Sequence, residues 1–252
     1  MTKIISIHSF RGGTGKTTIS TNVASLLAKS GLRVGLLDSD IQSPGAHILF
    51  GLNSNQVSKA LNHFLWGECE IGDTAYEVTD KLGDTTEGKL FIIPSSIQAS
   101  DIARILRDGY DEKKIQDALG QIGDTLELDI LIVDTHPGFN DTNLLIVALS
   151  ETLGVLLRPD QQDYQGTSVT MQIAKKLEVP EIKLIVNKSP SLFNPEMVRT
   201  KVEEAYGSDV AALLQHSNEV MALAGNGIFA LESPNDPFTE QIKQTALALA
   251  KG

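Results

Sequence analysis

A glycine-rich loop near the start of the chain limits what this sequence can fold into more than any other feature. Residues 10–18 read FRGGTGKTT and lie between an apolar run at Ile4–Ile7 and a helical pattern at Lys16–Lys29. Glycines let a loop wrap so that several backbone N–H groups point inward, and the following helix adds the positive end of its dipole. A strand, this loop and a helix, in that order, therefore predict a cradle for a phosphate group.

Short apolar runs alternate with amphipathic segments along the rest of the chain. Runs rich in Ile, Val and Leu are typical of buried parallel strands, and their alternation with helices implies helices on both faces of the sheet. We expect an α/β fold with a mostly parallel sheet, in one domain that spans residues 1–252, with an exposed loop or small hairpin at Gly67–Gly88. The predicted strands are Ile4–Ile7, Val34–Leu37, Leu90–Ile93, Ile130–Val133, Leu153–Leu157 and Lys183–Val186. The predicted helices are Lys16–Lys29, Ser100–Arg107, Asp111–Ile122, Gly166–Leu177, Pro195–Tyr206 and Phe238–Lys251.

The composition excludes several classes of protein. The formal net charge of -11 disfavours a surface that attracts polyanions everywhere, although 21 Lys and Arg leave room for a local basic patch. The single cysteine, Cys69, excludes an intrachain disulfide and a cluster held by several cysteines of one chain, which favours the reducing cytoplasm. No apolar stretch reaches membrane-spanning length, and the first ten residues are too short in their apolar part for a signal peptide.

Lys16 and Thr17 supply the side-chain chemistry of the loop. We expect Lys16 to contact the β- and γ-phosphates of a nucleotide and the Thr17 hydroxyl to bind Mg²⁺. The ordinary P-loop pattern has glycine where this chain has Phe10. The alternative is a glycine-rich turn that merely opens a helix, but the order of strand, glycines, Lys-Thr-Thr and helix favours the phosphate site.

The loop resembles the deviant Walker A motif of the ParA/MinD ATPases, K-G-G-x-G-K-[ST], which implies a P-loop NTPase fold of the SIMIBI type. Arg11 stands where this family has its signature lysine, which in relatives crosses a dimer interface to the partner's ATP. Arginine is permanently cationic and can bind phosphate bidentately, so the resemblance implies a catalytic role in trans for Arg11. The alternative is a solvated loop charge. The match assigns to the nucleotide Gly12, Gly13, Thr14, Gly15, Lys16, Thr17 and Thr18.

Two aspartates follow the second apolar run, in the sequence Leu36–Asp40. Carboxylates beside phosphates are tolerable where they face magnesium or water. The family equivalent is a D-x-D motif that proline usually follows, where this chain has Ile41. By that match Asp40 positions or deprotonates the attacking water, and Asp38 supports the hydration shell of Mg²⁺. The alternative is that both carboxylates cap the following turn.

Asp134 ends the apolar run Ile130–Val133 and begins the sequence DTHPG. An aspartate in this place resembles the Walker B residue, which holds Mg²⁺ through water. The run also matches the family's second switch loop, whose glycine, Gly138 here, can swing its amide toward the γ-phosphate. Nothing pairs His136 with a nucleophile, so we interpret it as a solvated or structurally bonded histidine.

Asn187 and Lys188 end another apolar run and open the guanine-reading motif N-K-x-D, but Pro190 stands where that motif has its aspartate. In the ParA/MinD family the matching asparagine bonds adenine, so the resemblance assigns Asn187 to adenine and indicates ATP. The segment Glu232–Pro237 resembles the loop that packs against the base, with Pro234 as a candidate contact.

The resemblance implies an ATP-dependent homodimer that hydrolyses ATP as a timer and parts afterwards. Such proteins position DNA, division machinery or large cytoplasmic bodies such as carboxysomes, and an adaptor protein stimulates hydrolysis. We expect residues 158–167 to contribute to a switch or partner surface. One alternative is a metabolic or electron-transfer enzyme on this fold, although the iron–sulfur members need paired cysteines that Cys69 alone does not supply. The other is a scaffold that senses ATP without hydrolysing it.

The last helical segment and the basic residues bear on the choice between a membrane and DNA. Phe238–Lys251 carries few charges, so we interpret it as a core helix rather than the basic amphipathic membrane helix of MinD-like relatives. ParA-like relatives bind DNA without sequence preference, so we expect ATP-dependent DNA binding and association with the nucleoid, with solvated helix faces as the alternative. The candidate basic groups are Arg104, Arg107, Lys113 and Lys114, and Lys175, Lys176, Arg199 and Lys201.

Overall fold

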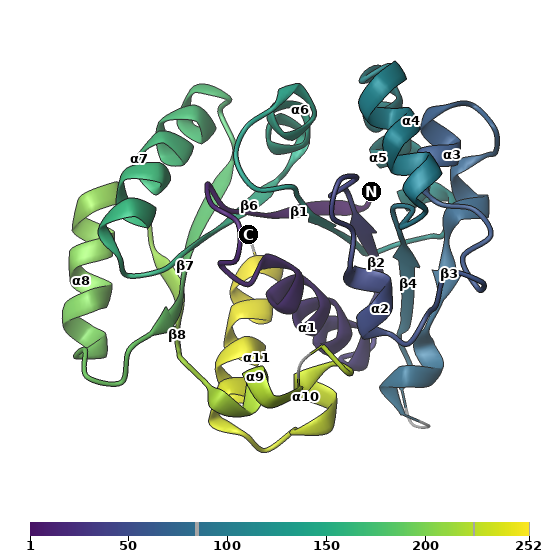
Figure 1. Cartoon of the computed structure of the whole chain (residues 1–252). Helices are drawn as coiled ribbons and strands as arrows, with labels where there is room; N and C mark the ends of the chain where they lie inside the picture. The colour runs from purple at the N-terminus through teal and green to yellow at the C-terminus, as the bar shows by residue number, and fades with distance from the viewer. Residues whose placement is uncertain (84–85, 224, 252) are drawn as a thin grey trace.

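One eight-stranded sheet organises the part of the chain that the structure describes (Figure 1). The structure is a computed structural model that describes residues 1–83, 86–223 and 225–251. The strand order is β3-β4-β2-β5-β1-β6-β7-β8, in which β3 pairs antiparallel with β4 and every other pairing is parallel. The strands are β1 (Lys3–His8), β2 (Arg33–Asp38), β3 (Tyr76–Glu77), β4 (Lys89–Ile93), β5 (Ile130–Asp134), β6 (Thr152–Leu157), β7 (Glu181–Ser189) and β8 (Val210–Gln215).

Helices cover both faces of this sheet (Figure 1). Helices α1 and α11 lie on one face with the short α2, α9 and α10, and α3 to α8 lie on the other. The helices are α1 (Lys16–Lys29), α2 (Ala46–Leu49), α3 (Leu61–Leu65), α4 (Ala99–Asp108), α5 (Lys113–Thr125), α6 (Asp141–Leu149), α7 (Gln161–Lys176), α8 (Pro195–Tyr206), α9 (Asn218–Leu223), α10 (Phe229–Glu232) and α11 (Pro237–Ala250), with 3-10 turns at η1 (Ile71–Thr74) and η2 (Thr79–Leu82).

The central strands are apolar on both faces because each face packs against helices. In β5, Ile130 and Ile132 join the core beneath α1 and α11, whereas Leu131 and Val133 join the core beneath α5 and α6. Successive side chains of a strand point to opposite faces, so a strand between two helical layers needs an apolar residue at every position. The continuous apolar runs of the sequence follow from this packing.

The predicted α/β class is confirmed, and each predicted strand lies within an observed one. The sequence did not lead us to predict β8, at the edge of the sheet, or α6. The apolar run Leu144–Leu149 forms the end of α6, where it could equally have been a buried strand, because a run apolar on all sides carries no period.

The prediction of an exposed loop or small hairpin at Gly67–Gly88 was largely wrong. This segment contains η1, β3 and η2, and its side chains Ile71, Val78 and Leu82 are buried in the core. The antiparallel pairing of β3 with β4 is the one hairpin-like feature, and residues 84–85 lie outside the described part. Ile71, Val78 and Leu82, although separated by polar residues, hold this segment against the core.

Helix α11 packs against α1 and β8, as predicted for a core helix. Its residues Phe238, Ile242, Ala246 and Leu249 are buried. In the described part of the chain, no helix combines the length and the apolar character that crossing a membrane requires.

Candidate functional site

The carboxyl ends of neighbouring parallel strands bring the predicted motifs to one edge of the sheet. β1 runs into the glycine loop, while β2 and β5 end at Asp38 and Asp134, which are register partners. β7 carries Asn187 to the same edge. Parallel strands gather their carboxyl ends on one side, and ligands bind there in open α/β sheets.

The glycine loop has the concave backbone that a phosphate requires. Gly13 and Gly15 have φ of 75° and 102°, which only glycine adopts without strain, and Gly15 is the N-cap of α1. The Thr14 side chain is buried and its hydroxyl donates to Ser9 Oγ at 3.0 Å. The first turn of α1 holds no acidic residue, so the positive end of the helix dipole stays available to an anion.

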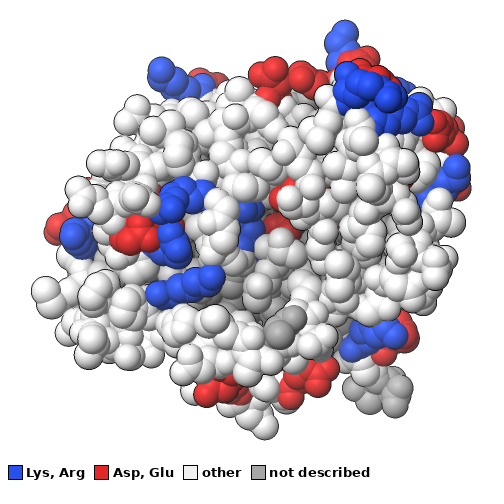
Figure 2. All heavy atoms as spheres, in the orientation of Figure 1, with Lys and Arg blue, Asp and Glu red and all other residues white. Residues whose placement is uncertain are grey.

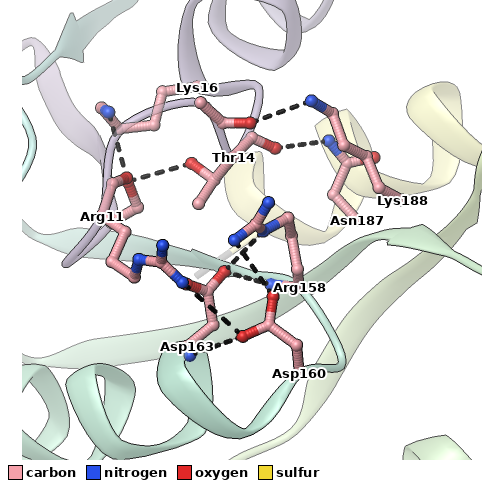
Figure 3. Close-up of polar contacts among 10 residues, drawn as sticks. Arg11, Thr14, Lys16, Arg158, Asp160, Asp163, Asn187 and Lys188 are labelled. Carbon is pink, nitrogen blue, oxygen red and sulfur yellow. Dashed lines mark hydrogen bonds and ion pairs between the residues drawn. The ribbon is translucent and has the colours of Figure 1, made fainter.

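The end of β7 holds the outside of this loop (Figure 3). The Asn187 side-chain amide donates to the Thr14 carbonyl oxygen at 2.8 Å, and Lys188 Nζ donates to the Gly13 carbonyl oxygen at 2.9 Å. A Cβ on Gly15 would lie 2.6 Å from the Asn187 amide nitrogen, so glycine is the residue that fits there.

Lys16 and the second switch loop both rest on Ser9. Lys16 Nζ donates to Ser9 Oγ at 3.2 Å, and the Gly138 backbone amide donates to the Ser9 carbonyl oxygen at 3.0 Å. Burial lowers the pKa of Lys16, and the nearby carboxylates of Asp134 and Asp40 oppose that shift. The Lys16 ammonium and the Gly138 amide, which the sequence motifs assign to phosphate, therefore both bond to Ser9 in this structure.

Asp38 and Asp134 form a buried acidic pair, each 1% exposed. Burial raises the pKa of Asp38 to about 7 and that of Asp134 to about 6, and the negative charge of Asp134 adds to the shift of Asp38. Asp38 accepts from the backbone amides of Gly45 and Ala46 at 2.9 and 3.0 Å. Asp134 accepts from the Ser20 hydroxyl at 3.0 Å, and a hydrogen bond from Thr17 lowers its pKa.

The chemistry of these donors fits magnesium. Thr17, Asp38 and Asp134 offer hard oxygen atoms, which Mg²⁺ prefers, and two buried acids of raised pKa are stabilised as carboxylates by a cation. No group of three or more His, Cys, Asp or Glu suited to a metal occurs within residues 1–83, 86–223 and 225–251. Few protein carboxylates are the rule for Mg²⁺ that is shared with phosphates and water.

The side chains of Asp40 and His136 bond to neighbouring backbone groups. Asp40 is half-buried, and its carboxylate accepts a hydrogen bond from the Ser43 backbone amide at 3.0 Å. In this structure Asp40 therefore caps the following turn, which is the alternative that the sequence left open. His136 Nδ1 lies 2.7 Å from the Pro137 carbonyl oxygen, a structural bond. Asn143 donates to the carbonyl oxygens of His136 and Gly138 at 2.8 and 2.7 Å, so α6 shapes the second switch loop.

Arg11 turns back onto its own chain (Figure 3). Its Nη1 lies 3.5 Å from Asp163 Oδ1 and 3.7 Å from Asp160 Oδ1, at the start of α7. Arg158 binds the other oxygens of the same acids, with Nε 3.1 Å from Asp163 and Nη2 3.0 Å from Asp160. Segment 158–167 thus holds an acidic pair that two arginines neutralise, and sequence reasoning did not assign Asp160 or Asp163 to Arg11.

A cavity of about 260 Å³ beside Asn187 is the candidate base pocket. Gly15, Thr18, Asn187 and Lys188 form one side. The other side is formed by the end of β8 and the segment after it, with Gln215, His216, Ser217, Val220 and Met221. The structure does not bring Pro234 to this pocket, because Pro234 lines a groove with Leu26 and Ser30 at the far end of α1. The sequence signal for the missed residues was the polar stretch that directly follows the apolar run of β8.

His8 is another residue that sequence reasoning missed. It is fully buried, and its Nδ1 lies 2.8 Å from the Thr135 hydroxyl, which itself donates to the Ile7 carbonyl oxygen at 3.0 Å. Burial lowers the pKa of His8 to about 3, so the ring is neutral. Because the Thr135 hydroxyl donates its hydrogen to Ile7, it accepts the hydrogen bond from His8, and Nδ1 is the protonated nitrogen. His8 therefore ties β1 to the second switch loop.

Comparisons with known proteins agree with this geometry. A family profile described as an AAA domain matches residues 2–185. An uncharacterized ATP-binding protein of Methanocaldococcus jannaschii is 30% identical over 97% of this chain and 86% of its own length. The crystal structure of the cell division ATPase MinD of Pyrococcus furiosus superposes with a TM-score of 0.82 at 19% identity, over 100% of this chain and 99% of the other. This chain belongs to the ParA/MinD family of ATPases.

Other similar proteins are named for different functions. The flagellum site-determining protein YlxH of Helicobacter pylori is 26% identical over 97% of this chain and 81% of its own length. The iron–sulfur cluster carrier protein of Pyrococcus furiosus is 31% identical over 73% of this chain, which spans 61% of that protein. Relatives with different activities thus resemble this chain, so its function has to be argued from the residues of its own site.

Proposed function

We propose that this ParA/MinD ATPase is a switch in which ATP joins two copies and hydrolysis to ADP and phosphate parts them. The observation that carries the proposal is the buried pair Asp38–Asp134 beside Lys16 and the glycine loop. Two acids of raised pKa in the protein interior are costly unless a cation meets them. A magnesium–nucleotide complex brings that cation and also the anion that the loop accepts.

Each residue has a role that its position supports. The loop amides of residues 12–18 and the Lys16 ammonium bind the phosphates, and Thr17, Asp38 and Asp134 would hold Mg²⁺, which neutralises charge on the phosphates. Asn187 and the pocket after β8 receive adenine. Asp40, half-buried at the mouth, orients or deprotonates the attacking water once it leaves the Ser43 amide.

Arg11 serves the partner copy in this proposal. Its guanidinium is held by Asp160 and Asp163, but Arg158 binds the same carboxylates and continues to neutralise them when Arg11 turns outward. Arg11 can therefore reach a phosphate of the facing copy without leaving a bare acidic pair behind. An arginine aimed at phosphates stabilises the charge that develops during phosphoryl transfer.

The work of the switch is the positioning of an intracellular cargo, such as DNA, the division machinery or a body like the carboxysome, with an adaptor that stimulates hydrolysis. YlxH is named for placing flagella, which supports positioning as the class of function. We place the protein in the cytoplasm, on the nucleoid when ATP is bound.

Nonspecific DNA is the proposed matrix, although four of the eight candidate cations have acidic or carbonyl partners in the single chain. Arg104 pairs with Glu68, and Arg107 with Asp108. Lys175 donates to the Tyr206 carbonyl oxygen and Arg199 to that of Val210. Figure 2 shows lysines and arginines as separate groups on the visible face, mostly beside acidic side chains. A DNA-binding band must therefore form across two copies.

The salt dependence of DNA binding tests whether DNA is the surface to which the ATP-bound protein attaches. Binding to duplex DNA is expected with ATP and not with ADP, with a log–log salt slope of about -0.9 per phosphate neutralised. Replacing Lys176 and Lys201 should weaken it. A dimer that DNA does not retain at low salt, with ATP and magnesium present, would remove DNA from the proposal.

A metabolic iron–sulfur role has less support. The iron–sulfur carrier relative is 31% identical, but this chain has the single cysteine Cys69, half-buried among the apolar residues near α3. A cluster would need cysteines from two copies in equal positions. Absorbance near 400 nm after iron and sulfide loading, lost in Cys69→Ser, would favour that role.

Phosphate release measured with and without magnesium tests hydrolysis directly. We expect turnover that requires magnesium and disappears in Lys16→Ala. An ATP-sensing scaffold would bind ATP but release no more phosphate than Lys16→Ala does. That result would overturn the proposed ATP hydrolysis.

A further inference from the structure

Lys188 lies outside every role given above, yet its backbone is bent to reach the glycine loop. Its φ is 55°, a left-handed conformation that is strained for a residue other than glycine. The pairing of β7 with β8 is irregular between Val186 and Ser189, so the strand is distorted at this point. Such irregularities re-aim a side chain, and here the ammonium reaches the Gly13 carbonyl oxygen at 2.9 Å.

The contacts of Asn187 and Lys188 fix two successive peptide planes of the loop (Figure 3). Lys188 binds the carbonyl of Gly13 and Asn187 binds the carbonyl of Thr14, both from the outside of the loop. In a trans peptide the N–H of the next residue points opposite to the carbonyl. The amides of Thr14 and Gly15 are therefore directed away from β7 and into the loop.

The two anchors differ in what else they can do. Asn187 is 5% exposed and lies against Gly15, and both Asn187 and Lys188 line the candidate base pocket. Lys188 is exposed, and its ammonium has the Gly13 oxygen as its single hydrogen-bond partner among the described residues. A charged donor on a backbone carbonyl is stronger than a neutral one, so Lys188 is the anchor whose removal most directly frees the loop.

We propose that Lys188 is a positioning residue, which orients the loop amides toward phosphate by holding the Gly13 carbonyl. The inference rests on the proposed nucleotide site and deepens it. Lys188 lines the candidate base pocket, but its ammonium is bound to the Gly13 carbonyl oxygen. It therefore acts through the loop and strengthens binding of any polyphosphate, whatever the base.

The test compares MgATP with magnesium pyrophosphate by calorimetry. Lys188→Met is expected to lower the affinity for both ligands by the same factor, about tenfold, as the loss of one charged hydrogen bond. Lys188→Arg should restore both to within about threefold. Lys251→Met removes an exposed lysine elsewhere and should change neither. A loss confined to ATP would show a base contact, and an equal loss in Lys251→Met would show bulk charge; either overturns the proposal.

Lys188→Gly separates positioning from a merely structural role. Glycine adopts φ of 55° freely, so this variant should unfold at a temperature close to that of the parent while losing the same affinity as Lys188→Met. A lowered unfolding temperature with unchanged affinity would contradict the inference.

A measurement without ligand distinguishes failure of this inference from failure of the nucleotide site. NMR order parameters of the Thr14 and Gly15 amides should fall from about 0.85 to about 0.6 in Lys188→Met. If the parent binds neither ligand, the nucleotide site is wrong and the order parameters still decide on Lys188. Unchanged order parameters would overturn the positioning role in either case.

Discussion

Two acidic pairs lie on either side of the glycine loop, and only one of them is neutralised by the protein. Asp160 and Asp163, at the start of α7, are bound by Arg11 and Arg158. Asp38 and Asp134, at the ends of β2 and β5, are both buried, and burial raises the pKa of each. Among the described residues no ion pair joins a cation to Asp38 or Asp134, and the charge of the nearby Lys16 opposes the raised pKa of Asp134 only in part. Two like charges buried together are costly, so this pair favours a cation from outside. In the proposed function, the first pair stabilises the fold and the second serves a ligand.

The largest effect expected is on nucleotide binding, at the lysine that faces the unneutralised pair. Lys16→Ala should lower ATP affinity by more than about a hundredfold, because the buried ammonium is lost from the phosphates. Calorimetry measures the change. Arg11→Ala is the matched control, a cation removed from the neutralised pair, and monomer affinity should then change by less than about threefold. Equal losses in both variants would erase the contrast.

Asp40→Ala should slow hydrolysis by about a hundredfold while leaving ATP affinity near that of the parent. The carboxylate caps a turn in this structure, so its removal tests whether it also serves water. Single-turnover phosphate release is the measurement, and the variant should accumulate as a nucleotide-bound dimer. Turnover like that of the parent would leave Asp40 with the turn alone.

Arg11 tests whether the neutralised pair can release one of its arginines. Arg11→Ala should abolish ATP-dependent dimers, and Arg11→Lys should retain them, since the family has lysine at this position. Chemical denaturation should show a loss below about 1 kcal/mol in Arg11→Ala, because Arg158 still binds Asp160 and Asp163. Complete dimerisation of Arg11→Ala, seen by light scattering, would assign the trans contact to another residue.

The smallest effects expected are on stability, and they differ in sign. Asp163→Asn should lower the free energy of unfolding by about 2 kcal/mol, since a buried carboxylate that binds two arginines is lost. Asp38→Asn should raise the free energy of unfolding of the nucleotide-free protein by about 1 kcal/mol at pH 8, because a buried charge is removed. Denaturation of each variant against the parent is the measurement.

The pH dependence follows from the raised pKa of Asp38. A carboxyl whose pKa is about 7 in the folded state binds its proton more tightly there than when unfolded, so it stabilises at low pH and loses that contribution as pH rises to about 7. The advantage of Asp38→Asn should therefore be absent near pH 4, grow toward pH 7 and stay constant above. An advantage that shrinks with rising pH would contradict the assignment.

The sequence was sufficient where each element carries its own signal. The strands beneath two helical layers read as unbroken apolar runs, and the glycine loop, Asp38, Asp134 and Asn187 each follow such a run. These residues meet because parallel strands end together, which topology alone dictates.

The rest depends on distant contacts that no local pattern carries. The candidate base pocket takes Gln215 from the end of β8 and His216 and Ser217 from the segment after it, about two hundred residues beyond the loop. Pro234, assigned by resemblance, lines another groove. Arg11 pairs with acids of α7 because Phe10 packs on Gly166, where a Cβ would lie 2.3 Å from the ring. A charged residue finds its partner through the fold, so its role could not be predicted from spacing.

Sedimentation velocity in the presence of different nucleotides tests the central claim most directly. The parent chain should sediment as a dimer with MgATP, and as a monomer with MgADP or with ATP and a magnesium chelator, because the unneutralised acids require the metal and the partner's Arg11 requires the third phosphate. The same sedimentation coefficient in all three conditions would contradict the account of a nucleotide-driven switch.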